Sequence, residues 1–74
     1  MGVNGMKVSY KKLFKLLIDR GMKKGELAEL SHLSSSSLAK LSKDENVSMD
    51  VLIRVCVALH VDFGDIMELV PDRN

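Results

Sequence analysis

The sequence has few of the residues that build disulfide scaffolds, metal sites and large aromatic cores. Its 74 residues include one cysteine, one proline, no tryptophan and only three aromatic side chains. The single cysteine, Cys56, excludes an intramolecular disulfide and the usual cysteine-based zinc sites. A small chain without a disulfide fits a reducing compartment. We therefore expect a cytoplasmic protein with no bound metal and no cofactor.

Long hydrophobic runs are also missing. No apolar run approaches the roughly 20 residues that a membrane span requires. The first six residues lack the charged start and apolar stretch of a signal peptide. With so few aromatic residues, the core must consist of Leu, Ile, Val and Met, and a chain this short buries only about 60% of its unfolded surface. Such a core leaves little room to enclose a substrate, so we do not expect an enzyme.

The net charge of +1 hides an asymmetry between the two halves of the chain. Residues 1–43 carry nine basic and three acidic side chains, a net charge of +6. Residues 44–74 carry two basic and seven acidic side chains, a net charge of −5. The first half suits a polyanion, which the second half would repel. An uneven solvated surface explains the same counts, so charge alone leaves both interpretations open.

The spacing of apolar residues predicts an all-α domain of five helices over residues 8–70, with flexible tails at 1–7 and 71–74. We expect helices at about 9–20, 23–31 and 34–43, a fourth that begins at residue 48, and a fifth from 62 that ends before Pro71. Good N-cap residues precede four of them: Ser9, Ser34, Ser48 and Asp62. Gly21 follows the first helix, where a left-handed residue is favoured. No segment alternates long enough to predict a strand.

Residues 24–43 match the requirements of two short helices that cross steeply and are joined by a tight turn. A small residue, Ala28, stands where the second helix crosses the first. Four positions later comes His32, a residue type that tolerates positive φ, where the turn needs one. Leu38 and Leu41 then give the second helix its inward face. This pattern predicts a helix-turn-helix.

The residues from Lys24 to Leu41, KGELAELSHLSSSSLAKL, resemble the helix-turn-helix of the Cro and phage-repressor-like family, also called the xenobiotic-response-element family of bacterial regulators. The stretches at 10–13, 45–48 and 65–68 resemble a subgroup of short, stand-alone members. The resemblance covers about residues 8–70, and His32 departs from the customary glycine. It implies a compact, five-helix, lambda-repressor-like domain whose third helix lies in the major groove of double-stranded DNA.

Carried over by position, the resemblance implies two groups of DNA contacts. The base-facing residues would be Ser35, Ser36 and Lys40. The residues at the DNA backbone would be Lys24, Ser34, Lys43 and Asn46, with Lys24 helped by the N–H groups at the start of its helix. Ordinary solvated lysines remain the alternative for Lys40 and Lys43. The lysines at 11, 12 and 15 are expected to form the solvent-exposed face of the first helix, and we do not include them in the site.

Serine discriminates bases weakly, because its hydroxyl both donates and accepts hydrogen bonds. Lys40 is the only long donor on the expected reading face and would favour guanine. One domain should therefore bind weakly, and useful specificity needs DNA shape or a homodimer on two half-sites about one helical turn apart. We expect the dimer interface on the fifth helix, at Ile66, Met67 and Val70.

Two functional hypotheses follow. The first is a DNA-binding transcriptional regulator, a repressor, that is controlled by its own concentration or by a regulatory protein partner. The second is a protein-interaction module that keeps the same fold but has little affinity for DNA. The weak reading face and the near-neutral total charge favour this alternative.

Overall fold

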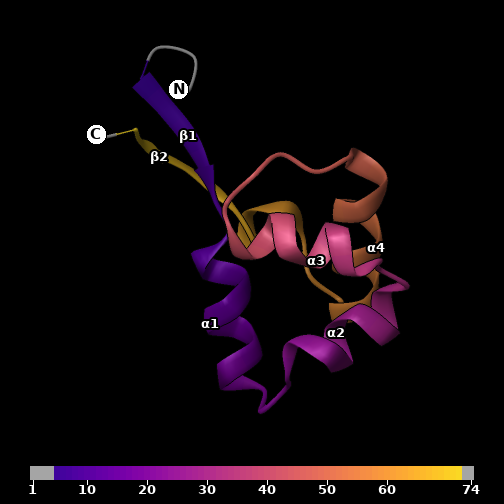
Figure 1. Ribbon diagram of the computed structural model, residues 1–74. Coiled ribbons are helices and arrows are strands. Elements are labelled where there is room, and N and C mark those ends of the chain that lie inside the picture. Colours follow the sequence, from indigo (N-terminus) through magenta and orange to yellow (C-terminus); the bar gives the residue numbers. More distant parts are fainter. Residues whose placement is uncertain (1–4, 73–74) are drawn as a thin grey trace.

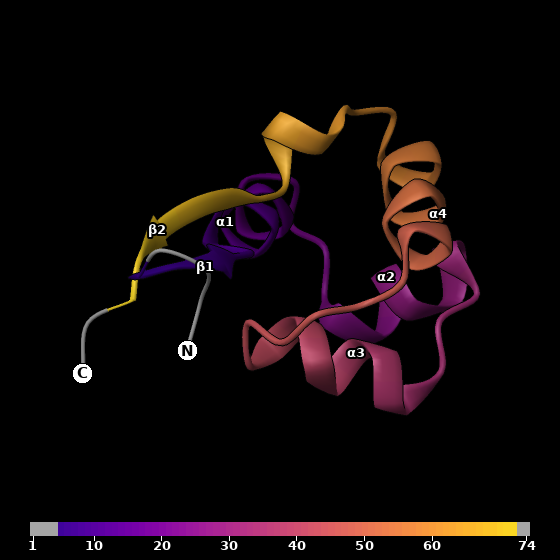
Figure 2. The same ribbon diagram turned by 90° about the horizontal axis from the view of Figure 1, so that it is seen from above.

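The computed structural model describes residues 5–72. Within them, the helices are α1 (Lys11–Asp19), α2 (Lys24–Ser31), α3 (Ser35–Ser42) and α4 (Met49–Leu59), followed by the short 3-10 helix η2 (Phe63–Asp65). Two strands, β1 (Met6–Ser9) and β2 (Glu68–Pro71), pair with each other. The helices gather into one body, and the strand pair extends away from α2, α3 and α4 (Figures 1 and 2).

The helices pack around one aliphatic core. Its buried members are Tyr10, Leu13, Leu17, Leu27, Leu41, Val51, Leu52, Val55, Cys56, Leu59 and Ile66. Each of α1, α2, α3 and α4 contributes at least one of these side chains, so the core fixes the helices relative to one another. Burying one such aliphatic side chain contributes about 1.5–3 kcal/mol.

The first helix is shorter than predicted. Tyr10, not Ser9, occupies the N-cap position, and the Ser9 hydroxyl accepts a weak hydrogen bond from the Lys11 N–H at 3.3 Å. The predicted end is confirmed, because Gly21 has a φ of 65°. At this end the Arg20 guanidinium donates to the Leu59 carbonyl at 2.6 Å. This bond ties the end of α1 to the end of α4.

Serine caps set the starts of α3 and α4, as predicted. The Ser34 hydroxyl accepts from the Ser37 N–H at 3.1 Å. The Ser48 hydroxyl accepts from the Val51 N–H at 3.2 Å. Such caps satisfy N–H groups that have no partner within the helix.

The prediction of a fifth helix is wrong. The predicted all-α, five-helix fold class is therefore also wrong, because the described residues form four α-helices, one 3-10 turn and two strands. Asp62 does cap a helical start: its N–H donates to the Asp65 carboxylate at 2.9 Å, and its own carboxylate accepts from Phe63 N–H at 2.7 Å. The helix ends after the single turn of η2. Gly64 lies inside that turn, and glycine weakens a helix by about 1 kcal/mol. Residues 68–71 instead pair as β2.

The two strands form an antiparallel sheet in the register Met6↔Pro71, Lys7↔Val70, Val8↔Leu69 and Ser9↔Glu68. Met6 and Lys7 therefore belong to a strand although a tail was expected up to residue 7, and Pro71 belongs to β2 and not to the expected second tail. Proline is tolerated there because an edge strand has one side free of pairing. Of the remaining tail residues, Gly5 and Asp72 are joined by a hydrogen bond from the Asp72 N–H to the Gly5 carbonyl at 2.6 Å, and residues 1–4 and 73–74 lie outside the described residues.

None of the helices in residues 5–72 is long and apolar enough to cross a membrane. In the same range, no group of three or more His, Cys, Asp or Glu side chains is arranged to hold a metal ion.

Candidate nucleic-acid interface

The turn between α2 and α3 has the predicted left-handed residue at its corner. His32 has φ 56° and ψ 47°, and the next N–H, that of Leu33, donates to the Ala28 carbonyl at 2.9 Å. The chain then enters α3 through the Ser34 cap. A non-glycine residue in this conformation is uncommon, although histidine is among the enriched types. The local geometry of the helix-turn-helix is therefore confirmed with His32 in place of glycine.

Arg54 of α4 holds this turn from outside the motif. Its guanidinium donates to the His32 carbonyl at 2.6 Å and pairs with the Asp50 carboxylate at 2.8 Å, one helical turn away. α2 also packs directly on α4, so Arg54 adds a polar contact to an apolar one. Arg54 was not predicted from the sequence, because no local pattern shows which carbonyl lies opposite a side chain 22 positions away.

α3 presents one face to the core and one to solvent. Leu41 is buried and Leu38 is half-buried, whereas Ser35, Ser36 and Lys40 are exposed. Ser36 and Lys40 lie one helical turn apart, so they share one strip of the exposed face. These are the three residues expected to face bases, and their side chains are free to reach a ligand.

The exposed face of α3 includes one residue besides those expected to contact DNA. Ala39, which the sequence analysis did not consider, is exposed beside Lys40. Its short side chain leaves room for another molecule to approach the helix closely. The Ser34 hydroxyl, by contrast, is occupied within the protein, since it accepts from the Ser37 N–H and donates to the Ser37 hydroxyl at 3.2 Å.

The loop after α3 carries two of the residues expected at the DNA backbone, Lys43 and Asn46, and both are exposed. Tyr10 fixes this loop from the start of α1. Its N–H donates to the Asp44 carboxylate and its hydroxyl donates to the Glu45 carbonyl, both at 2.9 Å. The loop is therefore held at two consecutive residues, Asp44 and Glu45, and Asp44 has a φ of 57°.

Lys24 is exposed at the first position of α2, and its side chain turns toward two other helices. The ammonium group lies 4.8 Å from the centre of the Phe14 ring, within the range of a cation–π contact. It also reaches the hydroxyl of Ser42, near the end of α3, at 3.4 Å. Lys24 and the end of α3 thus form one basic, hydroxyl-rich surface. Ser42 is a member of it that the sequence analysis missed.

Charge favours an anionic ligand at this surface. From Ser34 to Lys43 the sequence contains two lysines and no acidic residue. The acidic residues of the following loop are partly engaged, since Asp44 accepts from Tyr10. The charged side chains of α3 and its C-cap are therefore all basic, which suits phosphate groups and the acceptor atoms of guanine.

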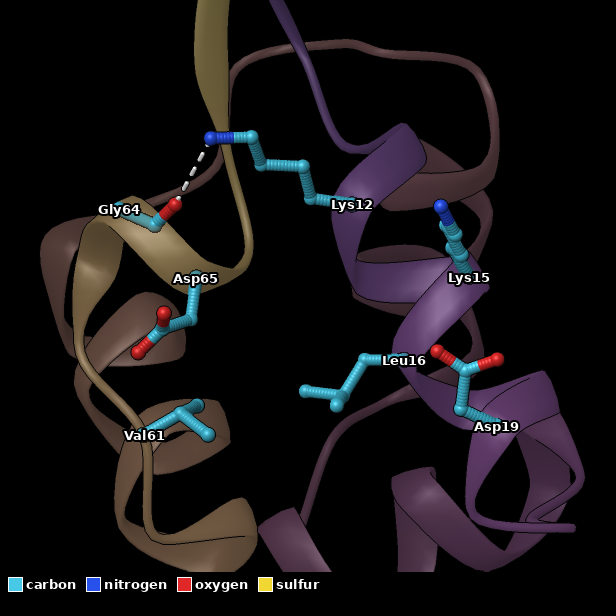
Figure 3. Close-up of a pocket in the computed structure, with 7 residues that line it drawn as sticks. All are labelled: Lys12, Lys15, Leu16, Asp19, Val61, Gly64 and Asp65. Atoms are coloured by element: carbon cyan, nitrogen blue, oxygen red, sulfur yellow. Dashed lines mark hydrogen bonds between the residues drawn. The ribbon is translucent and has the colours of Figure 1, made fainter.

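A groove of about 380 Å³ lies elsewhere, between α1 and the segment that includes η2 (Figure 3). Leu16 and Val61 supply its apolar surface, and Lys12 reaches across it to donate to the Gly64 carbonyl at 3.1 Å. None of the residues expected to contact DNA lines this groove. Lys12 thus has a structural contact of its own, outside the expected site.

The three residues expected at a dimer interface are not on one exposed helical face. Ile66 is 0% exposed and belongs to the core of its own chain, so the expectation that it contacts a partner is wrong. Met67 is half-buried against the same core. Val70 is half-buried in β2, where it pairs with Lys7. The missing fifth helix accounts for the error, because Ile66 ends the single turn of η2 and only Val70 of the three lies in β2.

Comparison with known proteins agrees with this geometry. The family model of the Cro/C1-type HTH DNA-binding domain matches residues 12–72. A solved structure, the crystal structure of the transcriptional regulator VanUg, is 58% identical in sequence and superposes with a TM-score of 0.88. The match covers 96% of this chain and 95% of that one. No curated protein matches the sequence. The resemblance drawn from residues 24–41 is confirmed: this chain belongs to the family of Cro/C1-type helix-turn-helix DNA-binding domains.

Proposed function

We propose that this protein is a transcriptional repressor that binds double-stranded DNA by inserting α3 into the major groove. The exposed face of α3 carries the proposal, because Ser35, Ser36 and Lys40 are exposed to solvent on a helix that is anchored by Leu41. Membership of a DNA-binding family supports it, as does the similarity to the transcriptional regulator VanUg. In this arrangement Lys40 donates to guanine and the two serines add weaker contacts.

Backbone contacts would position α3 in the groove. Lys24 and Ser42 form one surface, and Lys43 and Asn46 lie on the loop that Tyr10 holds in place. Lys24 and Lys43 both lie near the C-terminal end of α3, where they would meet phosphates on that side of the groove. Ser34 contributes mainly as the cap of α3, because its hydroxyl is already bonded to Ser37.

Two copies on a two-fold symmetric operator would supply the specificity that one reading face lacks. A single long donor on α3 discriminates one base pair by about 1–3 kcal/mol. Two half-sites one helical turn apart double the number of reading contacts. A protein bound to an operator that lies in the path of transcription would itself block transcription.

Selection of bound fragments from a randomised duplex library, at two salt concentrations, tests the proposal. The expected result is an enriched two-fold symmetric motif whose binding weakens steeply with salt. Lys40→Gln should then lower affinity for the selected duplex about tenfold and relax one position of the motif. Lys15→Gln is the matched control, since it removes an exposed lysine of α1 that lies outside the site. Retention without enrichment would refute sequence-specific repression. No retention would favour the protein-interaction module.

A further inference from the structure

α4 has two apolar faces, and only one of them packs against the protein. Of its eleven residues, only Asp50 and Arg54 are charged, and the other nine are apolar. One face supplies buried side chains from Val51 to Leu59. The other presents Met49, Ile53 and Val57 to solvent with exposed fractions of 59%, 47% and 67%. A helix that is apolar all round is normally covered on every side. These three residues are called the α4 stripe below.

The α4 stripe is symmetric about its middle residue. The intervals from Met49 to Ile53 and from Ile53 to Val57 are both four residues, so the three side chains form one row along the helix. If a second α4 packs antiparallel about a two-fold axis near Ile53, each Ile53 meets its counterpart. Met49 then meets Val57 of the other copy. A second copy of this chain therefore offers an apolar side chain at every position of the row.

The charges beside the stripe do not repel a second copy. Asp50 follows Met49 and Arg54 follows Ile53 in the sequence, and the two charged side chains are paired with each other at 2.8 Å. Arg54 also donates to the His32 carbonyl, so its guanidinium is directed to its own chain. The two charges that α4 itself places beside the stripe thus cancel. Such a surface suits an uncharged apolar partner, and an antiparallel neighbour also opposes the dipoles of the two helices.

The position of the stripe suits the proposed function. Met49 begins α4 only three residues after Asn46, in the loop expected at the DNA backbone. An interface that starts there adjoins the loop expected at the DNA backbone. The interface expected from the sequence is not available for this purpose, because Ile66 is buried.

We propose that the α4 stripe is the surface through which two copies of this chain associate. The proposal rests on the proposed function, since a two-fold symmetric operator needs two copies. The stripe is small: stable interfaces cover about 800 Å² on each partner, more than three side chains supply. We therefore expect weak association in solution that becomes complete when both copies bind one operator.

Cross-linking of the full chain tests the proposal directly. In a Cys56→Ala background, Ile53→Cys should give a disulfide-linked dimer as the main product with oxidised glutathione. The reason is that the two-fold axis brings the two β-carbons near the 3.5–4.5 Å that a disulfide requires. Ile18→Cys is the matched control, since Ile18 is an isoleucine of α1 that is 78% exposed and outside the stripe. Equal dimer yields from the two variants would overturn the proposal.

A second pair of variants tests the same surface without a cross-link. Ile53→Glu places two carboxylates together at the axis, so sedimentation should show a dimer dissociation constant raised at least about tenfold. Ile18→Glu should leave it unchanged, and thermal melts check that both variants fold. If duplex DNA carries two copies of wild type and of Ile53→Glu equally well, the proposed function stands and the α4 stripe is refuted as the interface. If Ile53→Cys cross-links but no duplex is bound, the stripe stands and the proposed function fails.

Discussion

Tyr10 joins the start of α1 to the loop after α3, and Tyr10→Phe measures what its hydroxyl contributes. The side chain is 2% exposed, and the hydroxyl donates to the Glu45 carbonyl at 2.9 Å. The substitution keeps the ring and the N–H bond to Asp44 and removes only this hydrogen bond. A typical intramolecular hydrogen bond contributes about 1 kcal/mol net. For a domain of this size, that loss lowers the melting temperature by about 4–8 °C.

Thermal and urea unfolding of wild type and Tyr10→Phe at neutral pH measure this loss. Because the ring stays in place, the dependence of the unfolding free energy on urea should be the same in both proteins. A variant as stable as wild type would show that the bond contributes nothing. A loss above about 3 kcal/mol would show that the ring itself had moved, since no single neutral hydrogen bond contributes that much.

The same variant isolates the ionisation of Tyr10. Burial, and then the negative charge of Asp44, raise the pKa of the Tyr10 hydroxyl above its ordinary value of 10.0. The folded state therefore keeps the proton more tightly than the unfolded state does. The stability from this group is complete below pH 10 and is lost as the pH rises from 10 through the folded-state pKa. Unfolding of wild type and Tyr10→Phe up to about pH 11 should show the stability difference narrowing or reversing. A constant difference would contradict this reasoning.

Five further substitutions, two of them controls, test other structural contacts by thermal unfolding. Ser34→Ala removes the N-cap of α3 and should cost about 1 kcal/mol; no loss would mean that the cap is not needed in solution. Arg54→Met removes the bond to the turn carbonyl and should cost about 1–2 kcal/mol, whereas Asp50→Asn, which removes only the surface ion pair, should cost under about 0.5 kcal/mol. Equal losses would show that the ion pair dominates. Ile66→Ala should cost about 2–5 kcal/mol through a core cavity, and Leu69→Ala, at a position 67% exposed, should cost far less. A mild effect at Ile66 would restore it as an interface candidate.

The parts of the fold that could be predicted depend on residues close together in the sequence. Leu38 and Leu41 determine which side of α3 faces inward, and so they also determine that Ser36 and Lys40 face outward. The serine caps act over three residues, and they place the starts of α3 and α4 correctly. The expected DNA-facing residues are accordingly exposed.

The errors come from contacts between distant residues. Asp62 and Asp65 signal a helical start, and the structure has one, but no local signal shows that the chain will pair with β1 after a single turn. The two strands are four residues each, too short for alternation to be recognised. Ile66 lies between η2 and β2 and is buried in the core, so the expected residues do not form one exposed helical face. The contact of Lys24 with Ser42 was missed for the same reason, because these residues lie on different helices.

The pairing of β1 with β2 also sets an order of folding. It joins residues 59 to 65 positions apart, whereas the contacts between α2 and α3 are local. During synthesis β1 is made first and waits for its partner until nearly the whole domain has emerged from the ribosome. Contacts of such high sequence separation form late, because the loop between them must first be closed. We expect the helices to assemble around α2 first and the pairing of β1 with β2 to form last. Because β1 and β2 are the first and last elements, a tag fused at either end would be attached next to this pair of strands and could affect its pairing.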